Sequence, residues 1–354
     1  GVQYRDIGKD GTVYGGPMYY LSKGLKEKGF AMLGKITAVL FAIFCIGGSF
    51  GGGNAAQSNQ ATIVLKELMG LESTSAGAII GVVLAILVGI IIIGGIKRIA
   101  SVTEKIVPFM AILYLVACLY IVLSNFSLVD NAFSLIITEA FNPQAIGVGG
   151  VIGVLLVGFK RAAFSNEAGA GSASIAHSAV KTKYSASEGL VALLEPFIDT
   201  VVICTMTALV IIIFNFGGAF EYGGDGAVMI DGVSYEGAGI TSMAFAKYIP
   251  YSNVFLTIAV VLFAVSTMIS WSYYGLQSWK FLFGRGSIAD LTYKLLFLIF
   301  VVIGAAASMK SIWGFSDAMI FAMVFPNMIG LFFLFPVVKK QLKRYLDAIK
   351  NTKS

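Results

Sequence analysis

Residues 164–171 read FSNEAGAG and combine hydroxyl, amide and carboxylate side chains with glycines that leave the backbone accessible. They follow an apolar run, 145–159, of about 15 residues, which would be roughly 22 Å long as a straight helix. A bilayer core is about 30 Å thick, so the polar stretch must also lie at membrane depth if the segment crosses. Irregular backbone is tolerated there only where it is buried in protein or lines a cavity. A glycine-interrupted span of this kind is typical of the binding site of a secondary transporter.

The composition indicates a polytopic membrane protein. Hydrophobic residues make up 57% of the 354 residues and charged residues 12%, with a mean hydropathy of +0.86, whereas soluble domains are about a quarter charged. The net charge of +6 does not indicate nucleic-acid binding, because the cations fall in loops between apolar segments. The single histidine, His177, is predicted to be an ordinary interfacial residue, and the cysteines lack metal-binding spacing and are predicted to pack in the apolar interior: Cys45, Cys118 and Cys204. An intramembrane enzyme is therefore not favoured, because it needs a nucleophile–base pair or metal ligands. A channel is not favoured either, because it needs repeated pore-lining elements and this chain has a single irregular break.

Eight segments are predicted to cross the membrane, and the fourth of them is the broken one: 31–53, 77–96, 106–123, 145–182, 189–214, 252–279, 288–309 and 313–338. Nineteen of the 25 lysines and arginines lie on one side of this arrangement, three lie on the other side, and three fall within segments. Because cytoplasmic loops carry the excess of Lys and Arg, both ends of the chain are predicted to be cytoplasmic.

Five blocks of the sequence, in collinear order, closely resemble the alanine or glycine:cation symporter family: GGPMYYLSKGL (15–25), GGIKRIASVTEKIVPFMA (94–111), FKRAAFSNEAGAGSASIAHSAVKT (159–182), FIDTVVICTMTALV (197–210) and STMISWSYYG (266–275). The resemblance implies a LeuT-like fold of the APC superfamily, with ten core helices in two inverted five-helix repeats and one extra helix ahead of them. It also implies uptake of small neutral amino acids coupled to sodium across the cell membrane, with no organic cofactor.

The same resemblance implies how the chain is organised. Its eight spans would be core helices three to ten of one all-α transmembrane domain, 1–354, with the remainder of the first repeat at 31–123 and the second repeat at 145–338. The opening stretch, GVQYRDIGKDGTVYGG, reads like an internal loop. We therefore expect an N-terminally truncated transporter that lacks the extra helix and the first two core helices.

An amino-acid substrate needs backbone N–H groups for its carboxylate, acceptors for its ammonium group and a tight apolar wall. The break can supply the backbone groups, and a helix predicted to begin near Gly169 would point its positive N-terminal end at an anion. Phe164 is the predicted wall, and Ser165 and Asn166 are the predicted polar contacts. The alternative for such a glycine-rich stretch is close helix packing.

Further contacts are implied in other spans. Gly52 and Gln57 match family positions that resemble substrate contacts, Trp271 is a candidate lid or wall, and Ser266 and Thr267 fall where LeuT-like proteins place hydroxyls on a sodium ion. Each has a structural alternative. For Gly52 and the polar residues near it, including Asn54, it is tight packing and interhelical hydrogen bonding. For Trp271 it is an ordinary interfacial position, and for the two hydroxyls it is bonding back to their own helix.

The charges near the break have two interpretations. Intramembrane charges are costly and usually face a partner or a cavity, so we expect Arg161 or Lys160 to pair with Glu167 or Asp199, with contact to the substrate as the alternative. Glu195 and Asp199 are four residues apart and share a helix face, which leaves proton coupling as the alternative to sodium coupling.

Overall fold

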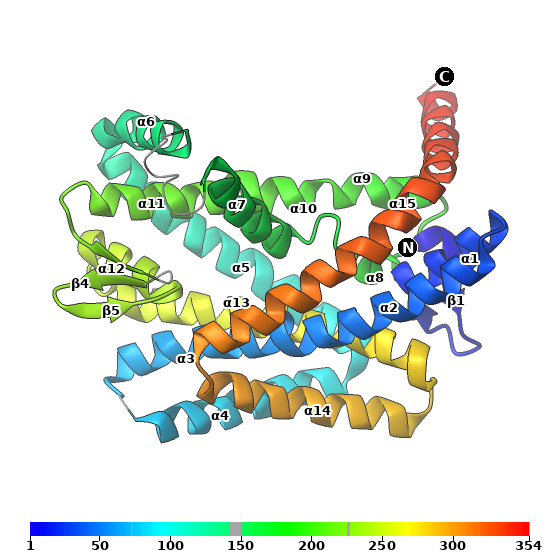
Figure 1. Cartoon of the computed structure of the whole chain (residues 1–354), viewed down its shortest axis with the longest axis horizontal. Coiled ribbons are helices and arrows are strands. Elements are labelled where there is room, and N and C mark those ends of the chain that lie inside the picture. The colour runs from blue at the N-terminus through cyan, green and yellow to red at the C-terminus, as the bar shows by residue number, and fades with distance from the viewer. Residues whose placement is uncertain (72, 142–149, 225–226, 354) are drawn as a thin grey trace.

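A computed structural model describes residues 1–354 other than 72, 142–149, 225–226 and 354. Long helices run side by side along the molecule, and small sheets lie at its two opposite ends (Figure 1). Seven helical stretches among the described residues are long and apolar enough to cross a membrane: Ala31–Met69, Ser75–Ile93, Gly95–Ser124, Ser185–Asn215, Ser252–Phe283, Ser287–Ala306 and Met309–Asn351. They coincide with seven of the eight predicted spans.

The fourth predicted span, 145–182, differs from the others. Its first five residues lie outside the described residues, α7 (Gly150–Asn166) has 17 residues, and α8 (Ala173–His177) has five. The two helices are separated by irregular backbone at 167–172. The predicted interruption is therefore present at the predicted place, whereas the count of eight complete spans remains a prediction.

The first long helix continues well beyond its predicted end at residue 53. It consists of α2 (Ala31–Phe50), the π-helical turn η2 (Gly51–Ala55) and α3 (Ala56–Met69). We expected the polar residues after Gly53 to end the span. They do not, because several of them donate hydrogen bonds to a neighbouring helix, as described below.

The next two helices correct a predicted loop. α4 (Thr74–Ile93) is followed almost directly by α5 (Gly95–Ser124), and the tight connection uses Gly95 at φ +68°. The predicted spans 77–96 and 106–123 leave Lys97, Arg98 and Lys105 in a loop between them, but these residues lie in the first turns of α5. Their cationic heads can reach the interface from a helix as well as from a loop, so the charge asymmetry is unaffected.

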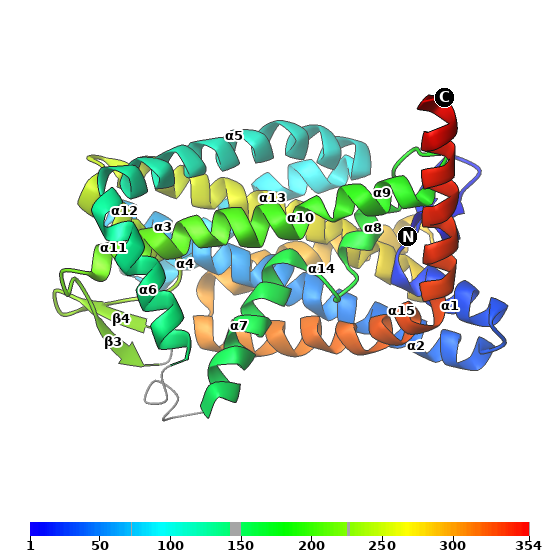
Figure 2. The same cartoon turned by 90° about the horizontal axis from the view of Figure 1, so that it is seen from above.

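The second part of the chain alternates short and long elements. η3 (Phe126–Leu128) and α6 (Val129–Ala140) follow α5, and after the break the chain forms α9 (Ser185–Ala192), α10 (Leu194–Pro196), the π-helical η4 (Phe197–Cys204) and α11 (Thr205–Asn215). The remaining helices are α12 (Ala238–Tyr248), α13 (Ser252–Phe283), α14 (Ser287–Ala306) and α15 (Met309–Lys353). The C-terminal part of α15, a helix that contains Pro326 and Pro336, turns away from the rest (Figure 1 and Figure 2).

In the described part of the chain, strands are present only outside the predicted spans, so the all-α prediction holds for the membrane part alone. At one end, β1 (Asp6–Ile7) pairs with β2 (Val13–Tyr14) beside η1 (Val2–Tyr4) and α1 (Pro17–Glu27). At the other end, β3 (Glu221–Gly224), β4 (Ala227–Ile230) and β5 (Val233–Tyr235) form an antiparallel sheet next to α12. These segments are polar and turn-rich, and in water a hairpin satisfies their backbone groups.

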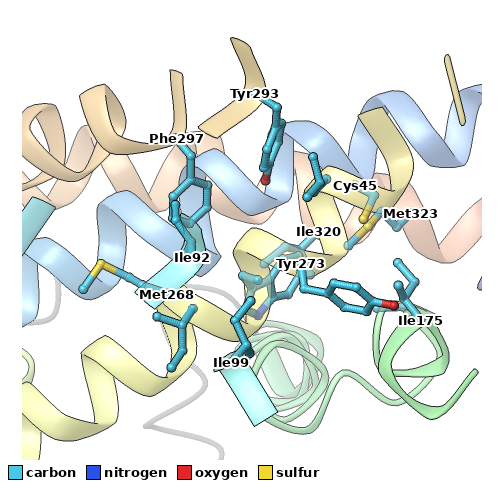
Figure 3. Close-up of a cluster of buried hydrophobic side chains, with 14 of the residues drawn as sticks. Cys45, Ile92, Ile99, Ile175, Met268, Tyr273, Tyr293, Phe297, Ile320 and Met323 are labelled. Atoms are coloured by element: carbon cyan, nitrogen blue, oxygen red, sulfur yellow. The ribbon is translucent and has the colours of Figure 1, made fainter. Parts of the chain in front are cut away.

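The interior is packed with apolar side chains from helices that are far apart in the sequence. Cys45 of α2, Met268 of α13, Tyr293 and Phe297 of α14 and Met323 of α15 belong to one buried cluster (Figure 3). Cys45 and Cys118 are buried and Cys204 is exposed, and all three are free thiols. The first two therefore act as packing residues, as the sequence predicts.

Polar side chains of the first long helix form a row of hydrogen bonds to α14. The Asn54 side-chain amide donates to the Phe297 carbonyl at 2.6 Å and the Ser58 hydroxyl donates to the Val301 carbonyl at 2.7 Å. The Asn59 amide donates to the Gly304 carbonyl at 3.2 Å and to the Ala307 carbonyl at 3.0 Å. The polarity of this stretch is thus explained, for these three residues, by interhelical bonding.

Replacing Ser58 or Asn59 with alanine is expected to lower the free energy of unfolding by about 1 kcal/mol each, since interhelical hydrogen bonds in membranes contribute of this order. Thermal or denaturant unfolding of the purified protein in detergent measures the loss. Ser101→Ala, on the exposed surface of α5, is the matched control and should leave the unfolding free energy unchanged. A loss for Ser101→Ala as large as for Ser58→Ala would contradict this role.

Candidate functional site

The break at 167–172 is built from residues in left-handed backbone conformations. Glu167 has φ +55°, Gly169 φ +85° and Gly171 φ +94°. Two of the three are glycines, for which this region carries no steric penalty, so the sequence itself ends α7 after Asn166. The next helix begins at Ala173 rather than near Gly169, and it is only five residues long. The expected helix N-terminus at Gly169 is therefore wrong, and Gly169 lies within the irregular backbone.

Asn327 of α15 stabilises the break. Its side-chain amide donates to the Gly169 carbonyl at 2.8 Å, and its carbonyl oxygen accepts a hydrogen bond from the Tyr20 hydroxyl of α1. A side chain at Gly171 would collide with Asn327, at 2.8 Å from its Cγ. Asn327 was not among the predicted site residues, although a polar amide in the middle of the apolar segment 313–338 was an available signal.

Phe164, at the end of α7, and Gly52, in the π-helical turn of the first long helix, are brought together in the fold. A Cβ added at Gly52 would lie 2.7 Å from Phe164 Cζ and 2.6 Å from Ile320 Cδ1 of α15. The Phe164 ring also packs against Trp313, with ring centroids 5.0 Å apart. The π-helical turn of the first helix therefore faces the last turn of α7 across an aromatic contact, and π-helical turns are frequent at functional sites.

Gln57 of α3 and Trp271 of α13 both contact the π-helical turn η2. The Gln57 side-chain amide donates to the Gly52 carbonyl at 3.0 Å, so this side chain is engaged with its own helix. Trp271 is buried, and a Cβ at Gly53 would overlap its Cγ and Cβ. Only a glycine at position 53 allows the indole of α13 to approach the backbone of η2 so closely.

Ser165 and Asn166 bond to η4 rather than to the turn around Gly52. The Ser165 hydroxyl donates to Asp199 Oδ2 at 2.5 Å, and the Asn166 amide donates to Thr200 Oγ1 at 2.8 Å. Four of the predicted site residues therefore lie together at the π-helical turn: Gly52, Gln57, Phe164 and Trp271. The other two, Ser165 and Asn166, are hydrogen-bonded to η4 instead.

The expected charge pairs near the break are wrong. Arg161 does not pair with Glu167 or Asp199; its Nη2 donates to both carboxylate oxygens of Asp317 in α15, at 2.6 and 2.5 Å. Glu167 accepts a hydrogen bond from the Ser172 hydroxyl at 2.6 Å. Arg161 turns toward α15 and the rings of Phe164 and Trp313 instead of toward the break.

His177 is more than an interfacial residue. Its Nδ1 lies 2.7 Å from Glu188 Oε1 and its Nε2 lies 3.0 Å from Glu195 Oε1. Both ring nitrogens are thus engaged by carboxylates of the following helical stretch. The i,i+7 spacing of Glu188 and Glu195 places them on one helix face, which was a signal for a shared partner.

A cavity of about 530 Å³ reaches the break from the end of the molecule that carries both chain termini. Its lining includes Asn166, Glu167 and His177. The four residues at the π-helical turn do not line this cavity: Gly52, Gln57, Phe164 and Trp271. The cavity therefore ends at the break, and Asn166 and Glu167 separate it from the turn around Gly52.

The predicted sodium ligands lie in the middle of α13. The Ser266 hydroxyl donates back to the Phe263 carbonyl at 2.9 Å, which is the structural alternative for this residue. Its oxygen still has lone pairs to offer a cation, and the partly buried Thr267 hydroxyl has no hydrogen-bond partner in the described part of the chain. Two neighbouring hydroxyl oxygens suit a hard cation such as sodium. No group of three His, Cys, Asp or Glu among the described residues could hold a metal ion.

Comparison with known proteins finds relatives that are all transporters. The model of the sodium:alanine symporter family matches residues 1–354. The chain is 38% identical to the sodium/alanine symporter AgcS of Methanococcus maripaludis, over 99% of this chain and 73% of the relative. It is 35% identical to the uncharacterized transporter YflA of Bacillus subtilis, over 99% of this chain and 72% of the relative. It is 33% identical to the putative sodium/proton-dependent alanine carrier protein YrbD of the same organism, over 97% of this chain and 69% of the relative.

The family and these relatives are transporters, and the seven long apolar helices agree with a multi-pass membrane protein. The match covers every residue of the chain, including the break, the π-helical turn and the middle of α13. This chain therefore belongs to the sodium:alanine symporter family, and it is a transporter rather than an enzyme.

Proposed function

We propose that this protein carries a small neutral amino acid, alanine or glycine, across the cell membrane together with sodium, by alternating access. The observation that carries the proposal is the contact between the π-helical turn of the first long helix and the end of α7: Gly51–Ala55 packs against Phe164, directly before the break. Irregular backbone at membrane depth offers unpaired N–H and carbonyl groups to a charged solute, which lipid-facing helices cannot do.

Each part of the substrate has a matching group in the protein. The backbone N–H groups of Ala168 and Ala170 already donate within the break, so those of Gly169, Gly171 and Ser172 suit the carboxylate. Backbone carbonyls of η2 with the Gln57 side-chain oxygen suit the ammonium group. Phe164 and Trp271 form the apolar wall. The wall is closely packed, because a Cβ at Gly52 would touch Phe164, and a closely packed wall suits a substrate with a small side chain.

Ser165 and Asn166 have a supporting part in this site. Their side chains donate to Asp199 and Thr200 of η4, so these hydrogen bonds hold the last turn of α7 in place. Phe164 belongs to the same turn. The two polar residues therefore position the wall, and a substrate at the break would lie next to them.

Sodium is the proposed co-substrate, and Ser266 and Thr267 of α13 are the proposed ligands. The Ser266 oxygen can bind a cation while its hydroxyl proton stays hydrogen-bonded to the Phe263 carbonyl, and Thr267 has both its lone pairs available in the described part of the chain. α13 also carries Trp271, one turn further on, so a cation bound at these hydroxyls and a substrate bound at the indole would bias the same helix. That shared helix is the proposed basis of coupling.

The finer architecture is also a proposal. We infer a LeuT-like arrangement in which 31–123 belongs to the first inverted repeat and 145–338 forms the second. The break at 167–172 supports this, because it lies in the first span of the second part, and inverted-repeat transporters form their sites from discontinuous helices of this kind. We further propose that both ends of the chain are cytoplasmic, and that the cavity reaching the break is the cytoplasmic path to the site.

Proton coupling is the second candidate function. The observation that favours it is the position of His177 between Glu188 and Glu195, on the lining of the same cavity. Asp199, the other carboxylate considered, accepts hydrogen bonds from Ser165 and Thr200 instead, so it and Glu195 have different partners. The two candidates are separated by removing sodium at fixed pH.

The proposal is tested by calorimetric binding of alanine to the purified full-length protein in sodium chloride and in choline chloride at one pH. We expect alanine to bind at least about tenfold more tightly in sodium, which corresponds to a coupling free energy of about 1.4 kcal/mol. Equal affinity in the two salts would overturn the sodium assignment.

Phe164→Ala is expected to weaken alanine binding by about tenfold or more in the same assay, because the apolar wall is removed. Phe159→Ala is the matched control, since Phe159 lies on α7 and is exposed. It should bind alanine as the unmodified protein does. Unchanged affinity in Phe164→Ala would place the substrate elsewhere.

A further inference from the structure

A small basic pocket, separate from the cavity that reaches the break, lies where α1, the end of α13 and the loop to α14 meet. Its volume is about 250 Å³. Three cations line it, Lys23, Lys280 and Arg285, together with Asp6, Tyr19 and Phe281. All three cations belong to the side of the membrane that is predicted to be cytoplasmic.

The ion pairs around the pocket leave positive charge in excess. Lys23 and Arg285 share the carboxylate of Asp6, and Arg285 Nη2 lies 3.0 Å from it. Lys280 and Lys294 share Asp290, each at 2.7 Å. Four cations are therefore paired with two carboxylates.

The carboxylates near the pocket, Asp6 and Asp10, do not cancel the positive charge of the cations. Burial raises the pKa of Asp6, but hydrogen bonds from Lys23 and Arg285 outweigh it and hold that pKa below its usual value, so Asp6 is an anion at neutral pH. Asp10 is within electrostatic reach of Lys280, but its carboxylate accepts hydrogen bonds from Thr12. With Asp10 counted as well, the cations still outnumber the acids.

Arg285 is held in place for a further contact. Its guanidinium stacks on the Tyr14 ring at 3.8 Å, and its Nη2 donates to the Tyr19 hydroxyl at 3.3 Å as well as to Asp6. Within the described part of the chain these hydrogen bonds use Nη2 alone, so Nη1 and Nε keep their donors for another acceptor. A guanidinium fixed in this way is suited to bind phosphate oxygens in pairs.

The chain on both sides of Arg285 is apolar and exposed. Phe283 is 61% exposed, Ile288 81% and Leu291 57%. In a membrane protein such side chains face acyl chains. A ligand with a phosphate at Arg285 would therefore have hydrocarbon-facing surface directly beside it, which favours a lipid over a soluble phosphate compound.

We propose that the pocket formed by Lys23, Lys280 and Arg285 binds the phosphate headgroup of an anionic phospholipid from the cytoplasmic leaflet. Basic pockets between helices on this side of a membrane bind such headgroups, and each cation contributes about 1 kcal/mol, or roughly fivefold in affinity. The proposal does not depend on which solute is transported.

The test measures the thermal unfolding of the purified full-length protein in detergent while phosphatidylglycerol or phosphatidylcholine is titrated in. We expect phosphatidylglycerol to raise the unfolding temperature and phosphatidylcholine to have a much smaller effect. In Lys280→Gln/Arg285→Gln, the phosphatidylglycerol concentration needed for half of the rise should increase by about tenfold or more. Lys340→Gln/Lys343→Gln, on the exposed end of α15, is the matched control and should respond as the unmodified protein does.

Lys280→Gln alone keeps the test decisive if the double variant does not fold, because Asp290 retains Lys294 as a partner. In this variant, the phosphatidylglycerol concentration that gives half of the rise in unfolding temperature should increase by about fivefold. Inorganic phosphate is the second arm: it should stabilise the protein far less than phosphatidylglycerol at the same concentration. Equal stabilisation by inorganic phosphate, or an unchanged response to phosphatidylglycerol in Lys280→Gln, would overturn the proposal.

Discussion

Gly304→Ala is expected to cost about 3 kcal/mol or more of unfolding free energy. A Cβ at Gly304 would overlap the Cα of Ala55 and lie 2.5 Å from its carbonyl oxygen. The obstacle is backbone, which cannot rotate away, so α14 would have to move off the π-helical turn. That movement would also lengthen the hydrogen bonds from Asn54, Ser58 and Asn59 to α14. Overpacking of this kind costs about 1–3 kcal/mol and occasionally more.

The matched control for Gly304→Ala is Gly314→Ala. Gly314 is also inside a long helix, but a Cβ there would meet nothing within 4 Å. Alanine has a higher helix propensity than glycine, so this change should be neutral or stabilise by up to about 1 kcal/mol. Unfolding of both variants in detergent gives the comparison. Similar stability of the two variants would contradict the close approach of α14 to the π-helical turn.

Gly52→Ala is expected to weaken alanine binding by about tenfold or more while leaving the protein folded. The added Cβ would lie 2.6 Å from Ile320 Cδ1 and 2.7 Å from Phe164 Cζ, which are the ends of side chains that can turn aside. The fold therefore tolerates the methyl group, but Phe164 has to leave the position in which it forms the wall. Calorimetric binding of alanine in sodium measures the loss of affinity, and thermal unfolding checks the fold.

Gly48→Ala is the control for Gly52→Ala, one helical turn earlier on the same face. Its Cβ would approach Ile320 and Trp271 no closer than 3.4 Å, which is ordinary contact. Its affinity for alanine should stay close to that of the unmodified protein. A folded Gly52→Ala protein that binds alanine as tightly as the Gly48→Ala protein would show that the site does not include this contact.

The membrane-spanning helices were predictable from the sequence because hydrophobicity and length largely determine them. Seven of the eight predicted segments coincide with long helices, and the break falls at the glycines of 164–171. Helix ends were less predictable. Polar residues normally mark the end of a span, but Asn54, Ser58 and Asn59 continue the helix because α14 offers carbonyl acceptors that no local pattern reveals.

The charge pairs were mispredicted for a related reason. Arg161 is close to Glu167 in the sequence but bonds to Asp317, which is 156 residues away. Proximity in the sequence favoured the wrong partner, and only the packing of α15 against α7 brings the right one close. The meeting of Gly52 with Phe164 was not predicted from spacing either. The family resemblance proposed Gly52, the chemistry of the break proposed Phe164, and the fold places them in contact.

The most direct measurement of the central claim is the uptake of radiolabelled alanine into proteoliposomes that contain the full-length protein, at one pH, with and without an inward sodium gradient. Sodium-coupled symport predicts that alanine accumulates above its external concentration only when the gradient is present, and that a sodium ionophore abolishes the accumulation. Equal accumulation with choline in place of sodium, or accumulation driven by a proton gradient alone, would contradict it.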